Sequence, residues 1–255
     1  MADMHSKLNE IYSLEQLSGK NTVIHNINPM VKIIVTVVYI VCLMTNNQYS
    51  LFSLSPFFFY PIVVTALAEV PYSVFLKRVL VALPFVLFAG ISNIIFNREK
   101  IILFSTVVVT AGVLSFTTLI IRTVLSVWAV LLLIATTKFT DLTKQLIKIH
   151  VPVFLVNLIE MIYRYIGVLI EEASTMITAY RLRNPGYKWP HIKHVGSFVG
   201  HLFLRSFDRA QRVYDAMKCR GYGEKQNIRF NYSMKIPDVI YLVICCVSSV
   251  VFVII

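Results

Sequence analysis

The stretch GVLSFTTLIIRTVLSVWAVLLLIAT, residues Gly112–Thr136, decides the fold class of this chain. Its only charged side chain is Arg122, and a helix that crosses the hydrocarbon core of a bilayer needs about 20 mostly apolar residues. We therefore predict a membrane-spanning helix here. An unpaired arginine inside the bilayer costs at least ~2.5 kcal/mol. We expect Arg122 to face protein or water, as an anchor for packing or a lipid headgroup rather than a substrate ligand.

The composition of the whole chain agrees with this prediction. Of its 255 residues, 57% are hydrophobic and 15% are charged, whereas a soluble domain carries about 25% charged residues. Other apolar runs of comparable length are Met30–Asn46, Leu51–Val70, Val79–Phe96 and Asp238–Ile255. The predicted fold class is therefore all-α, a polytopic membrane helix bundle of about five spans with long cytoplasmic helices.

Local features predict the shape of these runs. Lys32, near the start of the first run, is expected to snorkel towards the membrane surface along its aliphatic stem. Pro56 and Pro61 predict a kink in the second run. The segment FSTVVVTAG, Phe104–Gly112, is rich in β-branched residues and ends in glycine, which favours an extended conformation. Pro237 stands where the start of a helix tolerates proline.

The basic residues are concentrated in one region. Residues 138–235 hold 16 of the 24 lysines and arginines but 7 of the 13 acidic residues. Cytoplasmic loops of membrane proteins carry an excess of Lys and Arg, so we expect this region and the N-terminus in the cytoplasm of a multi-pass cell-membrane protein. The predicted domains are a transmembrane bundle at 1–137, a cytoplasmic or interfacial region at 138–236 and a last transmembrane helix at 237–255. The net charge of +11 then requires no nucleic-acid partner.

A further apolar run, Val151–Ile170, has the length of a span but contains Glu160 and Arg164 at helical spacing. A span here would place part of the basic region outside, against the charge rule. We interpret the run as the start of a long helix that continues to about Arg183 and lies on the membrane surface or against the bundle. Entry into the bilayer stays open as the alternative.

Two helices of the basic region are expected to end in an arginine that a helix breaker follows. Asn184 and Pro185 follow Arg183, and Gly221 follows Arg220 at a C-cap-like position. The second helix carries an apolar stripe on one face and basic residues on another, both at steps of four and three. The stripe is Phe203, Phe207, Ala210, Tyr214 and Met217, and the basic face is Arg205, Arg209 and Arg212. A terminal guanidinium suits a partner's carboxylates, although it can also simply complement the helix macrodipole.

Four segments resemble one family of transport proteins. The chain resembles the transmembrane T component of energy-coupling factor (ECF) transporters, and most closely the cobalt-type CbiQ family, over nearly its whole length. The segments are HNINPMVKI (His25–Ile33), IATTKFTDL (Ile134–Leu142), YRYIGVLIEEA (Tyr163–Ala173) and DRAQRVYDAMKCRGY (Asp208–Tyr222).

The resemblance implies a function and a set of partners. The family's coupling helices end in two Ala-Arg-Gly-like motifs that dock into grooves of two cytoplasmic ATPase subunits. Those motifs correspond here to Leu182-Arg183-Asn184 and Cys219-Arg220-Gly221. The partners implied are two CbiO-like ATPases, which bind the ATP and Mg²⁺, and a substrate-binding CbiM-like S component, with a small CbiN-like subunit as an additional member. The expected cargo is cobalt, with nickel or a vitamin as the alternative.

Other functional classes find less support in the residues. The phosphate-binding pattern G-x-x-x-x-G-K-[ST] is absent, and no Ser/His/Asp set is evident, so we expect a non-catalytic chain without a cofactor of its own. His191, His194 and His201 invite a metal site, but no carboxylate or cysteine joins them, and we expect none. A self-contained secondary transporter would need paired ionisable residues within its spans or an internal repeat.

Overall fold

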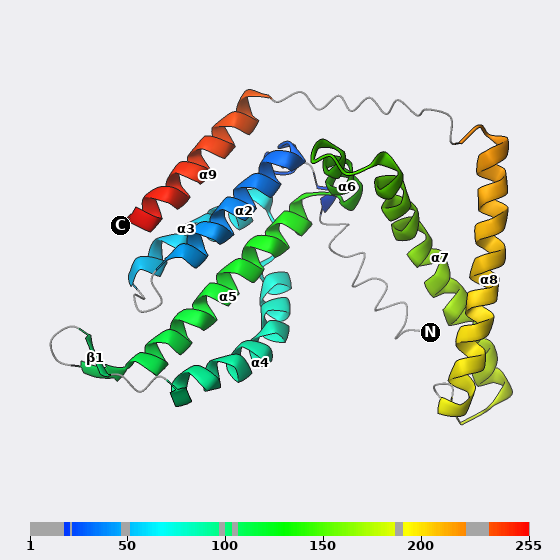
Figure 1. Ribbon diagram of the computed structural model, residues 1–255, viewed down its shortest axis with the longest axis horizontal. Coiled ribbons are helices and arrows are strands. Elements are labelled where there is room, and N and C mark those ends of the chain that lie inside the picture. The colour runs from blue at the N-terminus through cyan, green and yellow to red at the C-terminus, as the bar shows by residue number, and fades with distance from the viewer. Residues whose placement is uncertain are drawn as a thin grey trace. The chain divides into compact units, whose positions relative to one another are not determined.

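The computed structural model describes residues 18–20, 22–46, 52–96, 100–103, 107–186, 191–222 and 235–254. The chain divides into two compact units. The described residues of Ser13–Gln145 and Ser233–Ile255 form a helical bundle, and those of Leu146–Tyr232 form a helical hairpin (Figure 1).

The bundle is built from the apolar runs of the sequence. Helices α4 and α5 lie along each other, and α2 packs between α5 and α9 (Figure 1). A 3₁₀ helix, η1, leads into α3, and α6 follows α5 after a two-residue break. The bounds are α2 Pro29–Thr45, η1 Phe52–Phe58, α3 Phe59–Ala68, α4 Tyr72–Phe96, α5 Ala111–Thr136, α6 Phe139–Lys148 and α9 Ile236–Ile254.

Helices are confirmed at the expected apolar runs, with two corrections of boundaries. The second run is not one kinked helix, because Pro56 lies in 3₁₀ structure and the α-helix begins only at Phe59. The third helix begins at Tyr72 rather than Val79, since Lys77 is exposed and its charge does not prevent helix formation. Pro84, inside α4, did not enter the sequence prediction.

The predicted extended segment before α5 is confirmed over the residues that the structure describes. Strand β2, Val107–Thr110, pairs antiparallel with β1, Lys100–Leu103. Residues 104–106, the first part of the predicted segment, lie outside the described residues. This short hairpin leads directly into the N-terminus of α5.

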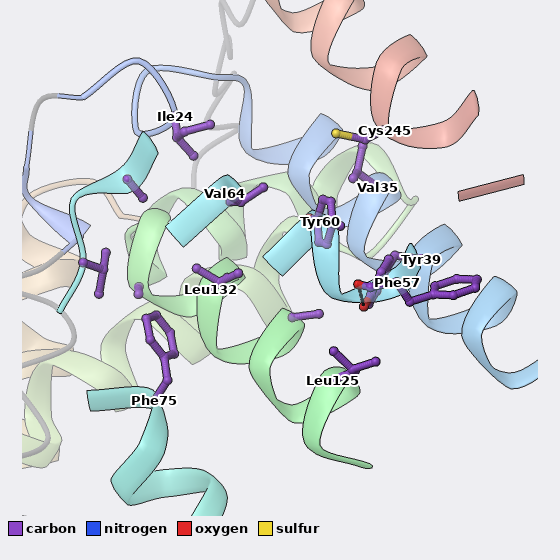
Figure 2. Close-up of a cluster of buried hydrophobic side chains, with 14 of the residues drawn as sticks. Ile24, Val35, Tyr39, Phe57, Tyr60, Val64, Phe75, Leu125, Leu132 and Cys245 are labelled. Carbon is purple, nitrogen blue, oxygen red and sulfur yellow. Dashed lines mark hydrogen bonds between the residues drawn. The ribbon is translucent and has the colours of Figure 1, made fainter. Parts of the chain in front are cut away.

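The bundle core joins aromatic and aliphatic side chains of α2, η1, α3, α5 and α9 (Figure 2). Tyr39 is fully buried in this core, with its ring 4.6 Å from that of Tyr60 and 5.8 Å from that of Phe57, measured between centroids. The Tyr39 hydroxyl donates to the carbonyl of Phe57 at 2.9 Å. The buried hydroxyl therefore keeps a hydrogen-bond partner, as buried polar groups generally do.

Two buried cations join α2 and α5, one towards each end of their contact. The ammonium of Lys32, near the start of α2, donates to the carbonyl of Thr136 at the end of α5 (2.8 Å). The guanidinium of Arg122 in α5 donates to the carbonyl of Asn46, the C-cap of α2. The helices are thus antiparallel, and each one provides a positive charge to a carbonyl at the other's C-terminal end.

These contacts decide two predictions. Arg122 is only 8% exposed and faces protein, as expected for a cation within a span. The prediction that Lys32 snorkels is wrong, because its side chain is 3% exposed. The free carbonyls at the end of α5 satisfy its ammonium inside the protein, so the side chain does not need to reach the membrane surface.

The second unit consists of two long helices, α7 (Val153–Arg183) and α8 (Ile192–Cys219). The predicted long helix that ends at Arg183 is confirmed. Among the described residues, α7 and the Gly112–Thr136 part of α5 are the two helices long and apolar enough to cross a membrane. The surface location of α7, which rests on the charge rule, stays a prediction.

Candidate functional site

Helices α7 and α8 form an antiparallel hairpin that carries every residue of the predicted site. Arg205 of α8 forms an ion pair with Glu172 of α7. Nearer the turn, the backbone N–H of His191 donates to the hydroxyl of Tyr180 at 3.4 Å. The ring of Tyr180 also lies 6.1 Å from that of His194, between centroids. These contacts run in opposite sequence directions along the two helices, which defines the antiparallel arrangement.

The first arginine motif lies at the turn of this hairpin. Leu182 is 80% exposed, and Arg183 and Asn184 are exposed as well. Both the backbone N–H of Asn184 and its side-chain amide donate to the carbonyl of Tyr180, at 3.0 and 3.2 Å. Asn184 has a φ of −128°, and the left-handed residue of the turn is Gly186, with a φ of +112°. Asparagine therefore occupies position 184 without backbone strain, and its side chain adds a capping bond.

The second motif lies at the end of α8 and is held by a different cap. The N–H of Gly221 donates to the carbonyl of Lys218 at 3.0 Å, and that of Tyr222 donates to Met217 at 3.0 Å. Gly221 has a φ of +73°. This pair of bonds around a left-handed glycine is the Schellman motif, which fixes the direction in which the chain leaves a helix. Arg220, the C-cap residue, is therefore held on a defined backbone with its side chain exposed.

The two arginines stand at opposite ends of the hairpin. Arg183 is the last residue of α7, whereas Arg220 follows α8 after that helix has run back along α7 (Figure 1). Because α8 has 28 residues and a helix rises about 1.5 Å per residue, roughly 42 Å of helix separate them. Neither side chain has an ion-pair partner within the part of the chain that the structure describes. The hairpin thus offers two separate, exposed guanidinium groups.

An apolar groove lies between the helices on the side of Arg220. Its volume is about 850 Å³, and the apolar stripe predicted on α8 lines one wall. Stripe residues stay largely open, with Phe203 65% exposed and Tyr214 63% exposed. The facing residues of α7 were not predicted, although they recur at helical spacing in the sequence and could have been found by that signal. They include Phe154, Leu158, Met161, Ile162, Tyr165, Ile166 and Leu169.

The predicted basic face lies along the seam between the helices. Arg205, Arg209 and Arg212 line a smaller cleft of about 260 Å³ together with Glu172 and Asp208. The Arg205 guanidinium forms an ion pair with Glu172, which links α8 to α7. The structure thus brings these arginines next to one another but separates them from the motif at Arg183.

The histidines that invited a metal site lie near the turn. His191 caps the start of α8, where its side chain accepts a bond from the N–H of Lys193. His194 and His201 are exposed on the same helix. Within the described ranges, no group of three or more His, Cys, Asp or Glu side chains is arranged to hold a metal ion.

Comparison with known proteins identifies the family of the chain. The family model described as "CbiQ: Cobalt transport protein" matches residues 20–229. An energy-coupling factor transporter transmembrane protein EcfT of Listeria innocua is 28% identical over 82% of this chain and 84% of its own length. An uncharacterised protein of Methanocaldococcus jannaschii is 26% identical over 92% of this chain and 83% of its own.

A shorter match carries the name of the cobalt branch. The cobalt transport protein CbiQ of Rhodobacter capsulatus is 26% identical over 46% of this chain and 49% of its own length. The family match covers most of the chain and includes both arginine motifs. The chain therefore belongs to the CbiQ family, and it is the membrane energy-coupling subunit of a transporter.

Proposed function

We propose that this chain is the T subunit of an ATP-driven cobalt importer of the energy-coupling factor type. It would transmit the motion of two cytoplasmic CbiO-like ATPases to a CbiM-like membrane subunit that binds the metal, with a CbiN-like small subunit as an additional partner. The chain itself is non-catalytic in this proposal. ATP and Mg²⁺ belong to the ATPases, since the sequence has no Walker-type glycine loop.

The observation that carries the proposal is the placement of Arg183 and Arg220 at opposite ends of one hairpin. A guanidinium presents several donors in a planar fork that matches carboxylates, and both side chains are exposed. With roughly 42 Å of helix between them, each end can engage a separate ATPase subunit. Movement of the two ATPases towards each other on ATP binding would then act on both ends of the hairpin at once.

The apolar groove gives independent support for a membrane-embedded partner. The exposed aromatic side chains Phe203, Phe207 and Tyr214 of α8 line this groove together. Large exposed apolar patches mark surfaces that bind another protein or the membrane. We assign this groove to the substrate-binding S component, whose hydrophobic helices have the matching chemistry.

Charge reversal at Arg220 tests the coupling role. Arg220→Glu places a carboxylate where the ATPase would present its own, so repulsion replaces a charge-assisted hydrogen bond. We expect lower co-purification of the ATPase subunits and loss of uptake in cells that express the partner genes. A matched control is Arg164→Glu, on the exposed surface of α7 away from both motifs. If Arg220→Glu retains both a fully stimulated ATPase pair and uptake, the coupling assignment is wrong.

A second candidate keeps the role and changes the cargo. The matched proteins that cover most of this chain include several named EcfT, a name that specifies no cargo, so nickel or vitamin import stays the alternative. Uptake of radioactive cobalt by cells that express the complete transporter, with excess nickel or vitamin as competitor, separates these cargoes. Reconstitution of the chain alone in vesicles excludes a self-contained secondary transporter if no substrate-specific flux occurs.

A further inference from the structure

The start of α2 is bonded to α5, which precedes the hairpin unit in the chain, and to α9, which follows it. The chain passes into the hairpin unit after Gln145 and returns to the bundle at Ser233. On the exit side, Lys32 is bonded to Thr136, the last residue of α5. On the return side, Asp238 in the first turn of α9 is bonded to Asn28, the N-cap of α2. The residues that make these two contacts from the α2 side, Asn28 and Lys32, both lie at the start of that helix.

The exit contact is a buried, charge-assisted bond. The Lys32 ammonium donates to the Thr136 carbonyl at 2.8 Å and to the His25 carbonyl at 3.2 Å. The side chains of Lys32 and Thr136 are 3% and 4% exposed. Bonds with one charged partner are stronger than neutral ones, and a buried one is little screened by salt. The end of α5, from which α6 continues, is therefore fixed to α2.

The return contact is buried as well. One carboxylate oxygen of Asp238 accepts from the N–H of Asn28, and the other accepts from the N–H of Lys235, both at 2.9 Å. Asp238 is 3% exposed. The same carboxylate thus caps the start of α9 and ties it to the start of α2. Asp238 also interacts electrostatically with the Lys32 ammonium, so the two contacts are neighbours at the start of α2.

We propose that Lys32 and Asp238 are positioning residues for energy coupling, which fasten the two chain connections of the coupling hairpin to helix α2 of the bundle. This inference rests on the proposed function. Along the chain, a pull on the hairpin reaches the bundle through residues 137–145 on the exit side and at Lys235 on the return side. With both connections anchored, the movement passes into α2, α5 and α9 together. If one of these contacts is removed, the end of α5 or the start of α9 can move independently of α2, and less of the hairpin's motion is transmitted to the bundle.

The test uses the complete transporter in vesicles and measures substrate imported per ATP hydrolysed. We expect Lys32→Met to retain the ATPase subunits and hydrolysis but to lower imported substrate per ATP by about tenfold, the factor that corresponds to one charged hydrogen bond. Lys32→Arg keeps the donor and should restore most of the ratio. The matched control is Lys20→Met, since Lys20 also donates to a helix-end carbonyl, that of Glu69 (2.8 Å), but is exposed. An unchanged ratio in Lys32→Met overturns the proposal.

A second measurement applies even if a variant fails to assemble with its partners. It also distinguishes failure of the anchor from failure of the proposed function. Hydrogen exchange of the isolated chain in lipid nanodiscs needs neither ATPase nor cargo. We expect Lys32→Met to accelerate exchange in residues 138–145 and Asp238→Asn to accelerate it in 236–242, with residues 195–215 of the hairpin unchanged. Equal exchange in variant and parent chain overturns the anchor even if transport fails. Accelerated exchange in a chain that couples to no ATPase leaves the anchor standing and refutes the proposed function.

Discussion

The backbone N–H of Tyr222 donates to the carbonyl of Met217 at 3.0 Å, and this bond closes the end of α8 around Arg220. It requires a left-handed residue between them, which Gly221 provides with a φ of +73°. Met217 and Tyr222 also both line the apolar groove, so the side chains that flank the cap lie on the same surface. The position of the Arg220 guanidinium therefore depends on a glycine that itself has no side chain to offer a partner.

Replacement of Gly221 should weaken coupling through the backbone alone. A Cβ at this position would meet no other atom within 4 Å, so the effect of Gly221→Val is expected to come from the backbone conformation. A β-branched residue in the left-handed region is strained by roughly 1–2 kcal/mol, and the cap should open. We expect reduced ATPase co-purification with an unchanged helix content, measured by pull-down and circular dichroism. Gly221→Asn, which tolerates the left-handed region, should retain most of the binding.

The other glycines of α8 provide the control for this prediction. Gly196 and Gly200 also have open space where a Cβ would stand, but neither has a positive φ. Alanine at either site should stabilise the helix by roughly 0.5–1 kcal/mol and leave ATPase binding unchanged. Loss of binding in Gly200→Ala would show that the effect at Gly221 is not specific to the cap.

The separation of Arg183 and Arg220 predicts a stepwise loss of ATPase subunits. Because they stand at opposite ends of the hairpin, reversal of one charge should release one ATPase and leave the other in place. Native mass spectrometry of the purified complex should detect a single remaining ATPase in Arg183→Glu and in Arg220→Glu, and none in the double variant. Loss of both subunits in each single variant would mean that the ATPases bind as one unit, and would contradict independent docking.

Much of this arrangement follows from local sequence patterns. Long apolar runs predict helices α2, α5 and α9, and the helix breakers after Arg183 and Arg220 predict where α7 and α8 end. Both predictions succeed because helix formation and termination depend on residues close together in the sequence. The contacts of Lys32 and Asp238 do not follow from such patterns. Their partners lie 104 and 210 residues away in the sequence, so only the packed bundle reveals that the start of α2 joins α5 and α9.

The site is predictable to a similar extent. The spacing of the apolar stripe on α8 correctly predicts one face of a helix, but the groove needs α7 as its second wall. The spacing of the basic residues at 205, 209 and 212 correctly predicts one shared face. It does not predict that Arg205 forms an ion pair with Glu172 of α7. The spacing of residues along one helix predicts which of them share a face, but it does not predict which element packs against that face.

Packing between α4 and α5 depends on the absence of a side chain at Gly90. A Cβ at Gly90 would overlap the ring of Phe116 on α5, and Gly90 is buried. Gly90→Ala should destabilise the bundle by roughly 1–3 kcal/mol, the usual range for an overpacked interior. Thermal unfolding in detergent measures the loss. Phe116→Ala in the same chain removes the overlapping ring and should recover part of it, and a double variant less stable than Gly90→Ala would contradict the contact.

The ion pair between Glu172 and Arg205 should make a small, salt-dependent contribution to the hairpin. The side chains are 27% and 60% exposed, and an exposed pair contributes about 0–1 kcal/mol. Arg205→Glu should lower the free energy of unfolding because two carboxylates then face each other, and the added change Glu172→Arg should restore it. Both effects should shrink at 1 M salt, where the screening length falls to about 3 Å. A swapped pair no more stable than the single variant would contradict a contribution of this ion pair to the hairpin.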